Sequence, residues 1–182
     1  MRADARDNRA RIMTAADDVF GRSPGASTDD VAKLAGVGIA TVFRHFATKT
    51  ELLEAVLTLR LERIRDRALE LTGSDDPGTA FFEFFTQVVA ESESKLAIAE
   101  ALTAAGAAAG EEAQEAGRGM RAAFDGLLIA AQKAGAVRAD AEMPEVYALL
   151  TGASRGATAA KLDAETRDRM LALIYDGLKP RP

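Results

Sequence analysis

The sequence contains no cysteine and one histidine among its 182 residues. Without cysteine, disulfide bonds, thiolate metal ligands and cysteine nucleophiles are excluded. A single histidine disfavours the common zinc sites, which take several histidine or cysteine ligands. It also leaves no serine, histidine and aspartate arrangement for nucleophilic catalysis, and no glycine-rich phosphate loop of recognised spacing is present. We therefore expect no metal, no cofactor and no enzymatic activity.

Long hydrophobic runs are also missing. No segment approaches the about 18 apolar residues that a membrane-spanning helix needs, and the N-terminal arginines are not followed by an apolar stretch. We therefore expect a soluble, cytoplasmic protein with no membrane partner. Proline is scarce, with 5 residues, while alanine, leucine, glutamate and arginine dominate. This composition predicts an all-α fold.

Charge is distributed unevenly along the chain. The net charge of −5 disfavours a protein that coats nucleic acid without selectivity. Residues 1–67 carry 12 Lys and Arg against 10 Asp and Glu, whereas residues 68–182 carry 11 against 18. An asymmetry of this size is also typical of ordinary solvated surface, so charge alone assigns no partner.

Residues 27–46 have the pattern of a helix-turn-helix. Ser27 or Thr28 can cap a first helix, and Asp30 stands three residues after Ser27, where a capping box requires an acceptor. The glycine-bearing stretch 36–38 then breaks the helical period, because glycine adopts positive φ at no steric cost. The stretch therefore predicts a short helix followed by a tight turn.

The second helix of this motif is expected over residues 39–46, with Val42 and Phe46 on its buried side. A third helix is expected to begin with Thr48 as its cap, to use Glu51 in the matching box position and to continue to about Leu71. Two short helices joined by a glycine-bearing turn are the geometry that places the second helix in the major groove of DNA. The pattern therefore predicts a DNA-reading head.

Helical patterns also flank this motif. An amphipathic helix is expected from about residue 11 to residue 20. The charged stretch 60–67 of the long third helix is expected to form solvated surface pairs. Residues 72–78 are the clearest internal joint, so we expect two domains, at residues 8–67 and 77–182. Further helices are expected over residues 79–93, 111–134, 144–160 and 163–177, and residues 95–109 are an alanine-rich piece interrupted by Gly106 and Gly110.

The run VAKLAGVGIATVFRHF, from Val31 to Phe46, is followed by Thr48, Lys49 and Leu52. This pattern resembles the signature of the TetR family of bacterial transcriptional regulators, most densely over residues 12–56. The later runs LLTGASRGA and YDGL are similar to an actinobacterial-type subgroup of TetR C-terminal domains. The resemblance implies an N-terminal three-helix head, joined by a long helix to a C-terminal helical domain that binds ligand and forms dimers.

The resemblance also implies which residues contact a double-stranded DNA operator. The positions where the family meets base edges are occupied by Gly38, Ile39, Ala40 and Arg44. The positions that contact phosphates, or brace those contacts, are occupied by Thr28, Thr41, Phe43, His45 and Lys49.

Two departures from the family pattern bear on these contacts. The family often has tyrosine where Phe43 stands, and the missing hydroxyl removes a hydrogen bond to phosphate, which leaves packing as the alternative role. Asp29 and Asp30 would repel the phosphates unless they serve as helix caps. Ordinary alternatives also remain for Arg44, as an exposed helix arginine, and for His45, as a side chain bonded within the protein.

A homodimer is expected, because each reading helix covers one half-site and a symmetric pair covers both. The last two helices offer an apolar face with small residues for close approach. The same residues could instead pack within the chain. The candidate interface consists of Leu149, Leu150, Ala153, Ala157, Leu173 and Ile174.

An apolar pocket for a small-molecule inducer, of unknown identity, is expected where large aromatic rings face segments of small residues. The alternative is that the same residues simply fill the core. The candidate lining is Phe85, Val88, Leu102, Phe124, Leu128 and Tyr147, with Arg155 as a polar anchor.

These patterns predict a sequence-specific DNA-binding transcriptional regulator, in the form of a homodimeric repressor that a small apolar ligand releases from a palindromic operator. One alternative is a small-molecule-binding or enzymatic α-helical protein in which the helix-turn-helix is incidental. Another is an adaptor for protein interactions. The lack of any catalytic constellation disfavours the enzyme.

Overall fold

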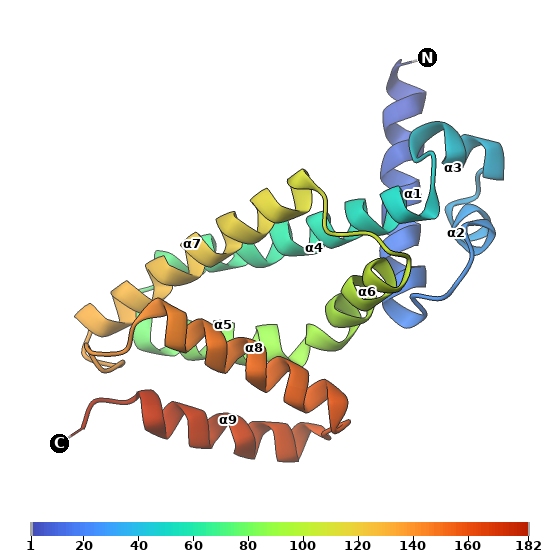
Figure 1. The fold of residues 1–182 in the computed structure, drawn as a ribbon. Helices are drawn as coiled ribbons and strands as arrows, with labels where there is room; N and C mark the ends of the chain where they lie inside the picture. Colours follow the sequence, from blue (N-terminus) through green and yellow to red (C-terminus); the bar gives the residue numbers. More distant parts are fainter. Residues whose placement is uncertain (1, 182) are drawn as a thin grey trace. The chain divides into compact units, whose positions relative to one another are not determined.

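The computed structural model describes residues 2–181, with the side chains of residues 6–181. Within this range the chain forms nine α-helices and no strand (Figure 1), which confirms the predicted all-α fold. No helix in the described range is long and apolar enough to cross a membrane. The helices are α1 Arg2–Arg22, α2 Thr28–Ala35, α3 Ile39–His45, α4 Lys49–Thr72, α5 Pro77–Ala90, α6 Ser92–Ala104, α7 Glu111–Lys133, α8 Met143–Ala159 and α9 Ala164–Leu178.

The described chain forms two compact units. The first contains the chain up to Arg60 together with Ser94–Glu115, and the second contains Leu61–Glu93 together with the chain from Ala116 onward. Helix α4 therefore begins in the first unit and continues in the second. The division into domains at residues 8–67 and 77–182 stays a prediction.

Helix α2 begins and ends as its local sequence predicts. The Ser27 hydroxyl accepts a hydrogen bond from the Asp30 N–H at 3.2 Å, and the Asp30 carboxylate accepts one from the Ser27 N–H at 2.9 Å. This reciprocal pair is the predicted capping box. At the other end Gly36 has φ of +63°, a left-handed conformation that glycine adopts without strain.

The start of α4 differs from its prediction in one hydrogen bond. Thr48 Oγ1 accepts from the Glu51 N–H at 3.1 Å, as a cap does. The Glu51 carboxylate, however, accepts from the Ala47 N–H at 2.8 Å rather than from that of Thr48. The Glu51 carboxylate thus binds the residue before the cap, so the side chains of Thr48 and Glu51 together fix the short link between α3 and α4.

An arginine of α1 also holds the turn between α2 and α3. Arg11 Nη2 donates to the carbonyl oxygens of Ala35 at 2.6 Å and of Gly36 at 3.1 Å. Carbonyls at a helix C-terminus have no partner within the helix, and a cation there also offsets the negative end of the helix dipole. Arg11 therefore stabilises the turn that orients α3.

We expect Gly36→Ala to lower the free energy of unfolding by about 1–2 kcal/mol, because alanine is strained in the left-handed region. The new Cβ would also lie 2.7 Å from Arg11 Nη2, so this side chain would have to shift. Urea unfolding followed by circular dichroism measures the change. Gly36→Asn is the matched control, since asparagine tolerates this conformation. An alanine variant as stable as wild type would contradict the assigned backbone geometry.

An ion pair joins α4 to α1 behind the helix-turn-helix. Arg60 Nε donates to the Asp17 carboxylate at 2.6 Å, and Arg60 Nη2 donates to the Asp17 carbonyl at 2.9 Å. The two side chains are only 15% and 18% exposed. The expectation of solvated surface pairs over residues 60–67 is therefore wrong for Arg60, because its partner is 43 residues away and the pair is largely desolvated.

The second unit is built around an aromatic cluster. Phe81, Phe84 and Phe85 of α5 are buried, and each ring contacts that of Phe124 on α7. Helix α5 also packs against α8 and α9. The Tyr175 hydroxyl on α9 donates to the Phe82 carbonyl at 3.2 Å. The four phenylalanines of α5 thus fix the core and the position of α9.

Candidate DNA interface

Helix α3 presents one exposed face and one buried face. Val42 and Phe46 are buried against the rest of the first unit, as the spacing predicts. The opposite face carries the residues that the family resemblance places on base edges, together with one large aromatic side chain. The exposed members are Gly38, Ile39, Ala40, Phe43 and Arg44.

Two features of this face suit contact with a base pair. Within the described part of the chain, the Arg44 side chain has no hydrogen-bond or ion-pair partner, so its guanidinium is available for the paired acceptors of guanine. An added Cβ at Gly38 would meet nothing within 4 Å, so the backbone at the N-terminus of α3 is open to a partner.

Most of the residues expected to contact phosphates are less exposed than those expected to contact bases, and one of them already has partners within the protein. Thr41 and His45 are half-buried on α3, and Thr28 is only 9% exposed at the start of α2. Lys49 Nζ donates to the Gly25 carbonyl at 3.2 Å and lies 5.6 Å from the centre of the Phe20 ring. Lys49 thus has a role within the fold, and any phosphate contact would share its ammonium group with these partners.

Asp29 and Asp30, which could repel phosphates, both have partners within α2 or at its cap. Asp29 pairs with Lys33 at 2.6 Å, one helical turn away, and this hydrogen bond raises the pKa of Lys33. Hydrogen bonds from the Ser27 side chain and backbone hold the pKa of Asp30 below its usual value. Asp30 therefore serves as a helix cap, which is the role that allows a carboxylate near a DNA-binding surface.

Sequence reasoning missed two arginines that contact the C-terminal ends of α2 and α3. The Arg9 guanidinium lies 5.2 Å from the centre of the Phe46 ring, at the C-terminal end of α3. Arg11 bonds the carbonyls at the end of α2. Both residues belong to the charged lead-in of α1, and their partners are at least 24 residues away, so no local pattern indicates them.

Two family models match separate parts of the chain. Residues 12–56 match the model described as bacterial regulatory proteins of the tetR family. Residues 76–180 match the model of the C-terminal domain of SbtR-like transcriptional regulators. The chain belongs to the TetR family. The resemblance that the run from Val31 to Phe46 indicated is therefore confirmed.

Solved structures of TetR regulators extend over almost the whole chain. One from Mycobacterium vanbaalenii is 36% identical, with a TM-score of 0.79, and the match covers 98% of this chain and 99% of that one. One from Streptomyces coelicolor is 28% identical, with a TM-score of 0.77, over 96% and 99%. The head-plus-body architecture expected from the sequence is thereby confirmed.

A curated HTH-type transcriptional regulator from Staphylococcus aureus is 35% identical over 66 residues. This match covers 35% of each protein, so it spans about a third of that relative's length. Together with the family models it makes the chain a DNA-binding transcriptional regulator of the TetR family and not an enzyme.

The residues expected at a dimer interface of this TetR-family protein are partly buried in the core and partly exposed. Leu150, Ala153 and Ala157 of α8 are buried in the core of the second unit. Leu149 is 40% exposed and Leu173 of α9 is 77% exposed. Ile174 packs partly against the core. The exposed pair is therefore free to meet a second molecule, whereas the buried residues already pack within the chain.

The residues expected at an inducer pocket belong to both units rather than to one. Phe85, Val88, Phe124 and Leu128 belong to the packed core of the second unit, and Tyr147 lies at its margin. The Arg121 guanidinium lies 4.0 Å from the centre of the Tyr147 ring. Arg155 is exposed on α8, and Leu102 is buried in the first unit.

Proposed function

We propose that this protein is a homodimeric repressor that binds a palindromic operator and is released from it by a small apolar ligand. The observation that supports operator binding is the exposed face of α3, where Arg44 has no partner among the described residues. An accessible guanidinium on a helix that can enter the major groove reads guanine through two hydrogen bonds. A cytoplasmic location belongs to the same proposal, since bacterial operators lie in the cytoplasm.

The dimer proposal is supported by the outer surface of α8 and α9, which lie side by side in the second unit (Figure 1). The exposed side chains of Leu149 and Leu173 are costly to leave in water when a symmetric partner can cover them. On α8, Gly152 and Gly156 have open space where a Cβ would be, which allows close approach of another helix.

We expect Leu173→Glu to convert the dimer to a monomer and to weaken operator binding at least tenfold, because a monomer reads only one half-site. Its fold should persist, since Leu173 is mostly exposed. Multi-angle light scattering gives the mass, and fluorescence anisotropy with operator DNA gives the affinity. Leu69→Glu is the matched control, because Leu69 of α4 is an exposed leucine outside the candidate interface. A wild-type monomer at micromolar concentration would contradict the dimer.

Release by an apolar ligand rests on the aromatic core of the second unit. A ligand that enters between α5 and α7 must displace rings that now contact one another, such as Phe85 and Phe124. Linkage requires the ligand to bind the DNA-free form more tightly than the DNA-bound form. A movement of rings within this core gives the ligand a physical means of distinguishing the two forms.

A thermal-shift screen of apolar compounds, followed by anisotropy with operator DNA, tests this part separately. The expected result is a compound that raises the melting temperature of the free protein and also lowers operator affinity. Deletion of the gene should raise transcription of the genes beside the operator. A screen in which no compound both stabilises the protein and releases its operator would contradict ligand release, and a fall in transcription on deletion would make the protein an activator.

A further inference from the structure

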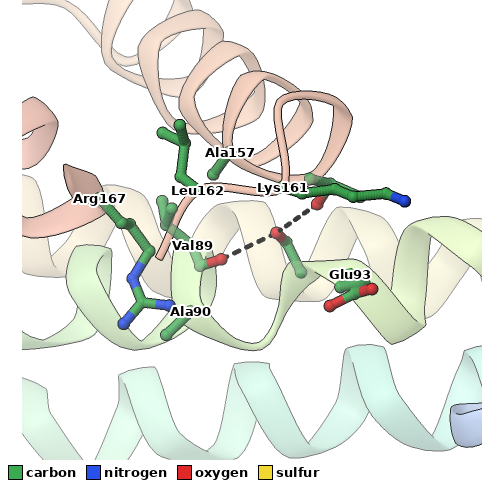
Figure 2. Close-up of a pocket in the computed structure, with 9 residues that line it drawn as sticks. Val89, Ala90, Glu93, Ala157, Lys161, Leu162 and Arg167 are labelled. Atoms are coloured by element: carbon green, nitrogen blue, oxygen red, sulfur yellow. Dashed lines mark hydrogen bonds between the residues drawn. The ribbon is translucent and has the colours of Figure 1, made fainter. Parts of the chain in front are cut away.

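A hollow of about 360 Å³ lies in the second unit, where the end of α5, the start of α6, the end of α8 and the start of α9 meet (Figure 2). Its size is at the lower end of the range for small-molecule sites. None of the candidate inducer-pocket residues contributes to it, so it is a separate feature. Its lining consists of Val89, Ala90, Ser92, Glu93, Ala157, Thr158, Lys161, Leu162 and Arg167.

Arg167 supplies the most distinctive group of this hollow. Its Nε is buried and has no hydrogen-bond acceptor among the described residues. Its one ion-pair contact, from Nε to the Asp168 carboxylate, is 3.8 Å long, which is beyond hydrogen-bond distance. A guanidinium stays charged at any ordinary pH, and a buried N–H without an acceptor is unfavourable. The described chain therefore provides no acceptor for Arg167 Nε, and a bound carboxylate would supply one.

The remaining lining has both charged and apolar parts. Figure 2 shows Arg167 at one side of the hollow, beside Ala90, with Lys161 and Glu93 at the other. Lys161 has φ of +49°, a strained conformation for a residue other than glycine, and strain of this kind is common at binding sites. The lining has two cations and one carboxylate, and Figure 2 shows Arg167 on the side away from Glu93, although the Asp168 carboxylate outside the lining lies 3.8 Å from Arg167 Nε.

The hydroxyl groups of the lining can also contribute. Ser92 Oγ is committed, because it donates to the Val89 carbonyl at 2.8 Å. Thr158 Oγ1 lies 3.4 Å from Ser92 Oγ, a weak contact, so its hydroxyl can turn toward a ligand. Val89, Ala157 and Leu162 add an apolar surface. These three side chains give the apolar body of a carboxylate a surface to contact.

We propose that this hollow binds a small organic carboxylate. The guanidinium of Arg167 receives the carboxylate oxygens, a geometry that its planar fork of N–H groups matches. The apolar body of the ligand lies against Val89, Ala157 and Leu162. This site involves neither α3 nor the aromatic core, so it does not depend on the proposed repressor function.

Nuclear magnetic resonance of the full-length protein, labelled with ¹⁵N, tests this assignment directly. Sodium benzoate is the probe and benzamide is its uncharged match in size, at constant ionic strength. The Arg167 Nε–H signal, identified by its loss in Arg167→Lys, is expected to shift and saturate with benzoate. Benzamide is expected to bind at least tenfold more weakly. No saturable shift, or equal binding of the two compounds, would overturn the proposal.

Three variants separate the site from a general charge effect. Arg167→Gln is expected to weaken benzoate binding at least tenfold. Arg169→Gln removes the same charge from the exposed side of α9, outside the hollow, and is expected to bind as wild type does. Ala90→Phe fills the hollow from an exposed position and is expected to abolish binding without lowering the melting temperature. Unchanged binding in both Arg167→Gln and Ala90→Phe would overturn the proposal, and none of these measurements uses DNA.

Discussion

Replacing Arg44 with alanine is expected to weaken operator binding by about 1–3 kcal/mol at each half-site, or about 2–6 kcal/mol for the dimer if the half-sites act independently. The side chain is exposed and has no partner within the described residues, so its loss should not change the free energy of unfolding. Fluorescence anisotropy with the operator and with single-base variants measures both affinity and specificity. Specificity should relax at one position of each half-site.

Lys49→Ala is the comparison for Arg44→Ala. Loss of a phosphate contact should lower the affinity for all DNA sequences alike and should reduce the salt dependence of binding. Lys49 also donates a hydrogen bond to the Gly25 carbonyl, so the free energy of unfolding of the Lys49→Ala variant must be measured as well. If the wild type and Arg44→Ala bind the selected operator equally, the base-reading face of α3 has been misassigned.

Phe124→Ala is expected to lower the free energy of unfolding by about 3–5 kcal/mol, the cost of deleting a large buried side chain and leaving a cavity. The ring is fully buried and lies 5.6 Å from the Phe81 ring and 5.1 Å from the Phe84 ring, measured between centroids. It is therefore the main aromatic link between α5 and α7. Urea unfolding followed by circular dichroism measures the loss.

Phe43→Ala is the matched control for this substitution, because Phe43 is exposed on α3. Its free energy of unfolding should stay within about 0.5 kcal/mol of wild type. A Phe124→Ala variant that loses less than about 1 kcal/mol would show that α5 and α7 are not held together by this ring cluster.

The parts of the fold that could be predicted from the sequence are those that local interactions determine. Ser27 and Asp30 cap each other across three residues, and Gly36 takes the conformation that the turn requires. The Asp163 cap of α9 is equally local, since its carboxylate accepts from the Thr166 N–H at 2.8 Å. These signals lie within one helical turn, so a single sequence contains all the information they need.

Helix boundaries in the alanine-rich region were predicted less well. The sequence indicated an alanine-rich piece over residues 95–109 that is interrupted by Gly106, and in the structure α6 begins at Ser92 and ends at Ala104. Gly106 has φ of +72°, and the Ala107 N–H bonds the Leu102 carbonyl, which ends the helix. The interruption at Gly106 was therefore indicated by the sequence, whereas the start of α6 at Ser92 was not.

The contacts that position the DNA-reading head are the least predictable from sequence. Arg11 bonds Ala35 across 24 residues, and Arg60 pairs with Asp17 across 43. Both arginines occur in charged stretches whose ordinary interpretation is solvated surface. The buried Nε of Arg167 could not be predicted for the same reason, since it depends on how α5, α8 and α9 pack together.

Selection of bound duplexes from a random DNA pool, followed by footprinting of the enriched sequence, tests dimeric operator binding most directly. We predict an inverted repeat whose half-site centres lie about one helical turn of DNA apart, or a multiple of it. Protection should cover both half-sites and should be lost with Arg44→Ala. Enrichment of no sequence, or protection of a single site without symmetry by the wild-type protein, would contradict a dimer that reads DNA through α3.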